Sequence, residues 1–158
     1  ALEGFQSLGL RRQARALSVR LLRQVEHALS LSFLSDDLAC VAGATLFLIY
    51  CRARFADLHH VTHVEQVGDT IEVTLSQVKV PDASRLGYAL VAPRLSIAGI
   101  DWWALTAEAV GGVGGLGHVA STNRGFNKSL RELLSSLCVP SSELEWYSSH
   151  SCKAKLLR

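Results

Sequence analysis

An uncharged stretch of 14 residues, Leu38 to Cys51, constrains the fold of this chain more than any other feature. A membrane-spanning helix needs about 20 apolar residues, so the stretch is too short for a membrane anchor. Ser35, Asp36 and Asp37 precede it, and a hydroxyl followed by carboxylates is typical of the first turn of a helix. We therefore predict a helix over residues 36–53 that is apolar on nearly all sides and lies at the centre of the core.

The composition indicates one folded domain. The chain has 158 residues, of which 49% are hydrophobic and 19% are charged, so it can bury one sizeable core and is too apolar for a disordered chain. Its four cysteines contain no CxxC pair, and we expect reduced thiols of an intracellular protein. The chain lacks Met and ends inside a predicted helix, so we expect it to be part of a longer polypeptide.

The net charge of +2 conceals an uneven distribution. Residues 1–35 contain five arginines and two acids, residues 36–118 contain five basic and nine acidic residues, and residues 119–158 contain six basic and three acidic residues. The two ends are therefore basic and the middle is acidic, which is a pattern relevant to binding partners and not to fold.

The remaining periodicities predict a mainly helical α+β domain with a small antiparallel three-stranded sheet. Residues 8–29 show apolar positions at 3.6-residue spacing, with arginines on the opposite half. Within residues 61–92, alternating residues on both sides of Gly68-Asp69 predict a hairpin, and residues 86–92 predict a third strand. Residues 101–158 predict helices, with Asp101 and Asn127 as N-caps, a flexible loop over residues 111–117, a break at Pro140 and a last helix from Ser148-Ser149.

Two motifs resemble known sites only in part. Residues 112–117 match GxGxxG, but a predicted helix precedes them where a dinucleotide site needs a strand, so we interpret them as a loop. His59, His60 and His63 form a cluster without a carboxylate or thiol partner at zinc spacing, and polar residues on a surface turn explain them better than a metal site.

Two segments are better candidates for phosphate chemistry. Arg52 and Arg54 follow the apolar helix, and Arg54 can either pair with Asp57 as a structural ion pair or bind a phosphate through its planar guanidinium. In the last segment, His150 and Lys153 lie three residues apart in the first turn of a predicted helix, where exposed amides favour an anion. The alternative for this second segment is an ordinary polar first turn.

The order and spacing of these segments resemble the catalytic domain of the tyrosine recombinases, the phage-integrase-like DNA strand-exchange enzymes. The resemblance runs from about residue 8 to the end of the chain, and its finer features are similar to divergent recombinases of eukaryotic mobile elements. It rests on three short motifs: Arg54-Phe55-Ala56-Asp57-Leu58, then Lys79 after the second strand of the hairpin, then His150-Ser151-Cys152-Lys153.

This resemblance implies a catalytic pocket of Arg54, Lys79, His150 and Lys153, supported by Asp57. Arg54 and Lys153 would stabilise the charge on a DNA phosphate, Lys79 would protonate the leaving 5′-oxygen, and His150 would bond the phosphate and assist proton transfer. The family uses no metal or organic cofactor. The implied partners are double-stranded DNA and, in the full-length protein, further copies of itself on DNA, without a membrane. The implied location is intracellular, and nuclear in a eukaryotic host.

The chain departs from the family pattern at two points. Lys153 stands where the family has a second arginine, and a lysine offers a point charge in place of a bidentate fork. The family's tyrosine nucleophile follows the second box, whereas Tyr50, Tyr88 and Tyr147 all precede His150, so we expect no nucleophile within these 158 residues.

Two alternatives therefore stay open. The first is a catalytically inactive DNA-binding remnant or domesticated module, and the second is a helical interaction domain without a DNA role. In a DNA-binding protein we expect the arginine face of residues 8–29, with Arg12, Arg15 and Arg23, to follow the phosphates.

Overall fold

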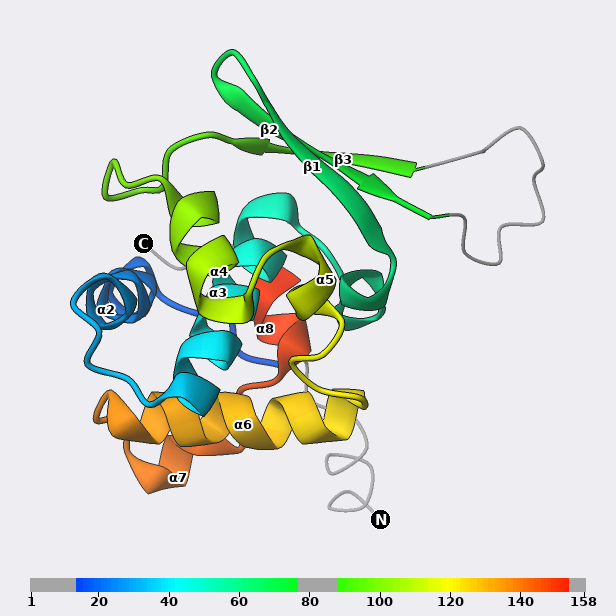
Figure 1. The fold of residues 1–158 in the computed structure, drawn as a ribbon. Coiled ribbons are helices and arrows are strands. Elements are labelled where there is room, and N and C mark those ends of the chain that lie inside the picture. Colours follow the sequence, from blue (N-terminus) through cyan, green and yellow to red (C-terminus); the bar gives the residue numbers. More distant parts are fainter. Residues whose placement is uncertain (1–13, 77–87, 154–158) are drawn as a thin grey trace, which may run out of the picture.

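The computed structural model describes residues 14–76 and 88–153. They form an α+β fold, mainly helical, with one small antiparallel sheet, as predicted (Figure 1). The elements are α2 (Val19–Ser30), α3 (Asp36–Cys51), the 3-10 helix η1 (Phe55–His59), β1 (Val61–Val67), β2 (Thr70–Leu75), β3 (Tyr88–Pro93), α4 (Trp102–Val110), α5 (Val113–Leu116), α6 (Asn123–Ser136), α7 (Ser141–Leu144) and α8 (Ser149–Lys153).

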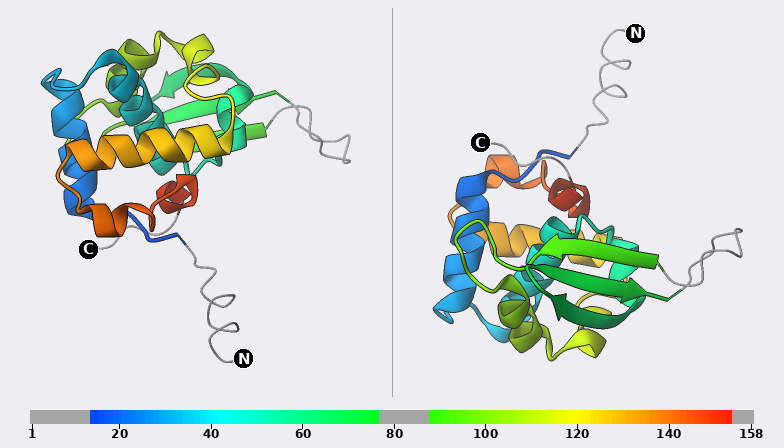
Figure 2. Two further views of the ribbon diagram at one scale, coloured as in Figure 1. Left: turned by 90° about the horizontal axis from the view of Figure 1, so that it is seen from below. Right: turned by 90° about the horizontal axis from the view of Figure 1, so that it is seen from above.

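Helix α3 is the centre of the core, as its apolar sequence predicts. Every residue from Val41 to Cys51 is buried, and the helix contacts α2, α4, α6, α8 and β3 (Figures 1 and 2). Ser35 caps it, because the Ser35 side chain accepts a hydrogen bond from the Leu38 amide. The helix ends at Cys51, two residues before the predicted end, since Arg52 takes a left-handed conformation with φ of 53°.

The sheet has the strand order β1-β2-β3, and both pairs are antiparallel. Along β2 the side chains of Ile71, Val73 and Leu75 are buried, while Glu72 and Thr74 are exposed. This alternation confirms the predicted period of two and turns one sheet face toward the helices. The helices lie on one side of the sheet, and the other side faces solvent (Figure 1).

The predicted helix over residues 8–29 is wrong for residues 14–18, because α2 begins only at Val19, and residues 8–13 lie outside the described part of the chain. The Ser18 side chain accepts a hydrogen bond from the Leu21 amide and caps the helix there. Residues 14–17 have no regular secondary structure, and the Arg15 amide donates to the Trp146 carbonyl at 2.8 Å. The apolar spacing continues through Leu17, which is fully buried, but tertiary contacts hold that residue outside the helix.

Three boundaries in the second half also differ from prediction. Helix α6 begins at Asn123 and is capped by Thr122, whose hydroxyl accepts from the Gly125 amide at 3.0 Å, so Asn127 lies inside the helix. The segment over residues 111–117 contains the helical turn α5 in place of a loop. After Pro140 the chain forms the short helix α7. The predicted start of the last helix is confirmed, since α8 begins at Ser149.

Candidate phosphate site

The arginine of the first motif lies on an exposed turn whose backbone is held by an aspartate. Arg54 follows the left-handed turn that ends α3, and its side chain is exposed. Asp57 is a buried residue, 8% exposed, and its carboxylate accepts a hydrogen bond from the Arg54 amide at 2.9 Å. Among the described residues, no ion pair joins this carboxylate to the Arg54 guanidinium. Asp57 thus fixes the backbone and leaves the guanidinium available to a ligand.

The histidine of the second motif lies in the first turn of α8, and its side chain is exposed. Two asparagines of α6 hold the start of this helix. The Asn127 Oδ1 accepts from the Ser149 amide at 2.8 Å, and the Asn123 Oδ1 accepts from the Ser149 hydroxyl at 2.6 Å. The backbone of Lys153 belongs to α8, and its side chain is not among the described ones.

The N-terminal half of α6 connects the two motifs. The Phe55 ring, next to Arg54, packs against the Phe126 ring with the centroids 5.6 Å apart. Phe126 is followed directly by Asn127, which holds the start of α8. Helix α8 also contacts α3, the helix from which the Arg54 turn emerges (Figure 2). The fold therefore brings the first and second motifs to a common support, although they are far apart in the sequence.

Of the predicted basic site residues outside the two motifs, Lys79 and Arg12 lie outside the described residues, whereas Arg15 and Arg23 are described. Arg15 is engaged within the chain, since its guanidinium lies 3.4 Å from the Glu143 carboxylate and 5.2 Å from the centre of the Trp146 ring. Arg23 is exposed on α2, which lies at the edge of the molecule, and α3 lies between α2 and α8 (Figure 1).

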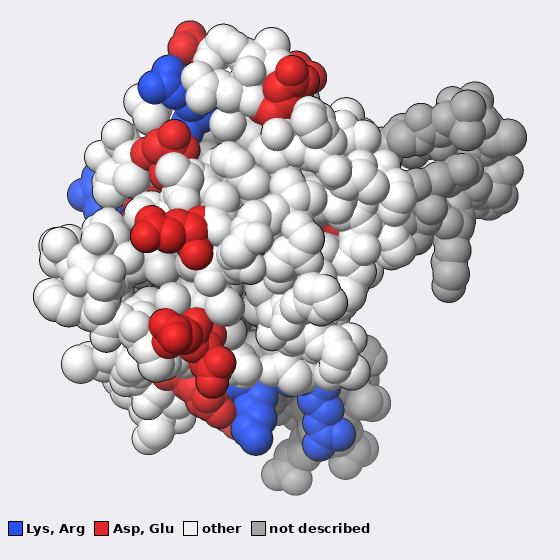
Figure 3. All heavy atoms as spheres, viewed as in Figure 1, with Lys and Arg blue, Asp and Glu red and all other residues white. Residues whose placement is uncertain are grey.

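Sequence reasoning missed three basic residues of α6. Arg124 and Lys128 are exposed on the half of the helix that supports both motifs, and blue side chains gather over α6 in Figure 3. Arg131 has a structural role, because its Nε donates to the carbonyls of Leu144 and Tyr147 and so holds the segment that leads into α8. The helical spacing of Arg124, Lys128 and Arg131 was a usable signal, since positions three and four apart share one face.

The two tyrosines with described side chains, Tyr50 and Tyr147, are buried. The Tyr50 hydroxyl donates to the buried Glu26 carboxylate at 3.0 Å and accepts from the Ile97 amide at 3.2 Å. Burial, together with the nearby Glu26, raises the pKa of the Tyr50 hydroxyl well above its ordinary value. Tyr147 is 6% exposed. Both residues thus have structural positions, and the expectation that these 158 residues contain no nucleophile stays a prediction.

The histidine cluster and the glycine motif have structural partners. His59 Nε2 lies 3.1 Å from the Ala120 carbonyl, His60 Nδ1 lies 3.3 Å from the Ser76 hydroxyl, and His63 faces Glu65. Within residues 14–76 and 88–153, no three His, Cys, Asp or Glu side chains are grouped as metal ligands would be. A Cβ at Gly115 would overlap the Val110 carbonyl, so the absence of a side chain at this position of α5 lets the helix pack against the end of α4.

Comparisons with known proteins identify no relative. No protein-family model, no curated protein and no solved structure matches this chain. In the part of the chain that the structure describes, no helix is both long enough and apolar enough to cross a bilayer.

Proposed function

We propose that this chain forms the phosphate-activating part of a DNA strand-cleaving and rejoining domain of the tyrosine recombinase type. The observation that carries the proposal is the double role of α6, which packs against the residue after Arg54 and also holds the residue before His150. An exposed guanidinium and an exposed imidazole thus project from two segments that share one rigid support. A guanidinium and an imidazolium each donate charge-assisted hydrogen bonds to phosphate oxygens.

In this reaction a tyrosine hydroxyl attacks a DNA phosphodiester, which gives a 3′-phosphotyrosine and releases a 5′-hydroxyl. Arg54 stabilises the charge on the non-bridging oxygens, and Asp57 holds the Arg54 backbone in place. His150 donates to the phosphate, and Lys153 adds a weaker positive charge. Lys79 supplies the proton that the leaving 5′-oxygen takes up.

The surface charges favour one approach for DNA. Arg124 and Lys128 lie exposed on α6 beside the two motifs, and cations of this kind position a phosphate backbone. On the solvent face of the sheet, Glu65 and Glu72 lie directly opposite each other across β1 and β2. Two facing carboxylates repel each other and also repel phosphates, so DNA approaches over α6 and α8.

A test that requires no tyrosine uses a nicked duplex whose 3′ end carries a 4-nitrophenyl phosphate ester next to a 5′-hydroxyl. The 5′-oxygen attacks the phosphorus, the bond from phosphorus to the nitrophenyl oxygen breaks, and the hydroxyl proton passes to the enzyme or to water. The products are a joined strand and 4-nitrophenolate, which absorbs light. Randomised flanking sequences prevent a requirement for one target site from hiding the activity.

We expect the 158-residue chain to accelerate this joining and the variant Arg54→Ala to lower the rate by about 10²–10³-fold, since one charge-stabilising group is removed. Arg52→Asn is the matched control, because Arg52 is exposed two residues away and Asn tolerates its positive φ. Joining at the background rate contradicts the proposal. If DNA still binds in that case, the chain is an inactive DNA-binding module.

Binding itself has a separate test. We expect weak binding to duplex DNA with little sequence preference, and a steep loss of affinity between about 50 and 200 mM salt, because bound phosphates release counterions. Arg124→Ala combined with Lys128→Ala should weaken binding without unfolding the domain, since both side chains are exposed. The triple change of Arg12, Arg15 and Arg23 to Ala tests the expectation, drawn from the sequence, that the arginine face of residues 8–29 follows the DNA phosphates. An affinity that does not respond to salt would contradict a phosphate interface.

A further inference from the structure

Two surfaces, one along α2 and one at the turn that follows it, combine apolar side chains with opposite charges. The first, which we name the acidic knob, lies at the turn between α2 and α3 and consists of Leu31, Phe33, Asp36 and Asp37, together with Glu108 of α4, which lines the same pocket as Asp36. Phe33 is 72% exposed and Leu31 is 48% exposed. The three carboxylate residues are also exposed.

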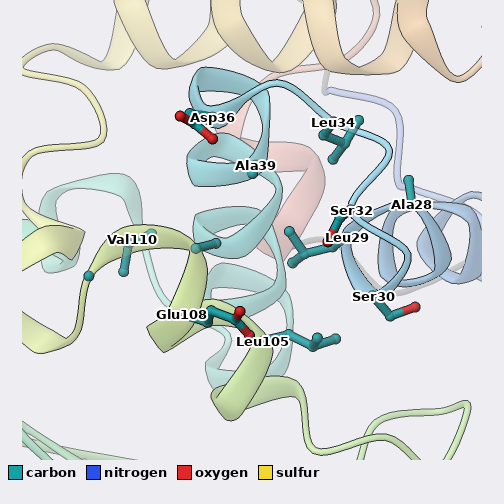
Figure 4. A pocket seen from close by; sticks show the side chains of 12 residues that line it. Ala28, Leu29, Ser30, Ser32, Leu34, Asp36, Ala39, Leu105, Glu108 and Val110 are labelled. Carbon is teal, nitrogen blue, oxygen red and sulfur yellow. The ribbon is translucent and has the colours of Figure 1, made fainter.

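The surroundings of the acidic knob are negative. A pocket of about 600 Å³ lies between α2, α3 and α4, and no Lys or Arg lines it. Figure 4 shows the Asp36 and Glu108 carboxylates at this pocket, together with the apolar side chains of Leu34 and Leu105. The C-terminal ends of α2 and α4 also contribute residues to it, and helix C-termini carry partial negative charge.

The second surface, which we name the basic hollow, lies along the outer side of α2. It has a volume of about 730 Å³, and Val19 of α2 together with Ala98 and Ile100 of the loop before α4 forms the apolar part of its lining. The rest of the lining consists of Gln24, the buried Glu26 and three basic residues, Arg20, Arg23 and His27. These three side chains are exposed, and among the described residues neither arginine forms an ion pair.

We propose that the acidic knob of one copy of this chain docks into the basic hollow of a second copy, which gives a two-fold symmetric dimer with antiparallel α2 helices. Phe33 fills the apolar floor of the hollow, and the carboxylates around it meet Arg20 and Arg23. The hollow runs along α2 from Val19 to His27, and the knob follows Ser30, the last residue of the helix, so Arg20 and the start of the knob lie roughly 16 Å apart along the helix axis. An antiparallel pair therefore engages both contacts at once.

Physical reasons favour a second copy over another occupant. A large exposed aromatic side chain flanked by acids needs an apolar surface rimmed by bases, and this same chain presents one. Closed two-fold dimers are the commonest assembly of identical chains, and they use the same patch twice. The proposal does not rest on the proposed function, and it assigns Arg23 to a protein contact in place of DNA.

Sedimentation velocity of the full 158-residue chain, without DNA and over about 1 to 100 µM, tests the dimer. We expect a monomer–dimer equilibrium that weakens as salt is raised, since the rim contacts are ionic. Phe33→Ser should raise the dissociation constant at least tenfold. The side chain is exposed, so this change should leave the thermal unfolding temperature nearly unchanged. A chain that stays monomeric at the highest concentration, or one that forms growing assemblies in place of dimers, overturns the proposal.

Charge-reversal variants test whether Arg23 of one copy contacts Glu108 of the other copy. Arg23→Glu and Glu108→Arg should each weaken the dimer about tenfold or more, and the double variant should recover most of the loss, because the reversed charges meet across the two-fold axis. Glu108 lies in the last turn of α4, where an arginine is favoured by the helix dipole, so folding should not suffer. Glu72→Arg, on the exposed sheet face, is the matched control. Additive losses in the double variant would exclude this pairing.

Discussion

Replacing Asn127 by alanine should loosen α8 and leave the rest of the domain intact. The Asn127 side chain accepts a hydrogen bond of 2.8 Å from the Ser149 amide, and Ser149 is only 6% exposed. A buried amide that loses its acceptor costs about 1–3 kcal/mol, which corresponds to an equilibrium change of about 5- to 150-fold. The same substitution improves the intrinsic helix propensity of α6 by several tenths of a kcal/mol, so α6 itself should not weaken.

Hydrogen exchange measured by mass spectrometry separates a local opening of α8 from a destabilisation of the whole domain. In Asn127→Ala we expect the amides of residues 149–153 to exchange about 5- to 150-fold faster, because α8 opens locally, while the amides of α3 keep their rate. Lys128→Ala is the control, since Lys128 is the exposed neighbour on the same helix and makes no hydrogen bond to α8 among the described residues.

Adding Asn123→Ala should increase the opening further, because Asn123 accepts from the Ser149 hydroxyl. If exchange in α8 does not change, the asparagines do not hold the helix and the positioning of His150 by α6 is refuted. Faster exchange throughout α3 would instead mean that the substitution destabilises the whole domain.

Three further outcomes test other parts of the structure. Tyr50→Phe should lower the free energy of unfolding in urea by about 2–4 kcal/mol, because it leaves the buried Glu26 carboxylate without its partner, and a loss under about 1 kcal/mol would contradict this. Iodoacetamide at pH 8 should modify exposed Cys138 well before Cys152, since burial raises the pKa of the Cys152 thiol to about 12; equal rates in peptide mapping would contradict the packing. In the nitrophenyl ester assay, Lys153→Arg should raise the joining rate through a bidentate contact, and a slower rate would refute the alignment of the second motif.

The sequence by itself determined the elements whose local signals agree with their packing. Helix α3 is an example, because Ser35 caps it and its residues are apolar on all sides, so the cap and the burial predict the same helix. The strand alternation of Ile71, Val73 and Leu75 likewise predicts both the strand and the buried face. The same agreement places the start of α8 at Ser149.

Where local signals in the sequence compete, only the tertiary contacts decided where a helix begins and which residue caps it. Residues 14–18 continue the helical spacing, but the bond from the Arg15 amide to the Trp146 carbonyl, together with the Ser18 cap, starts α2 at Val19. Asn127 is a good capping residue by type, yet its side chain binds the Ser149 amide and Thr122 takes the cap. Sequence periodicity describes one element at a time and cannot show which distant backbone group will meet a side chain.

For the candidate site, the sequence likewise determined the residue types, and the tertiary structure determined their contacts. The sequence supplied Arg54, Asp57 and His150 as chemically suitable groups. It did not show that Asp57 binds the Arg54 backbone in place of the guanidinium, or that α6 supports both motifs. These relations depend on contacts between segments far apart in the chain, which form only when the core around α3 packs.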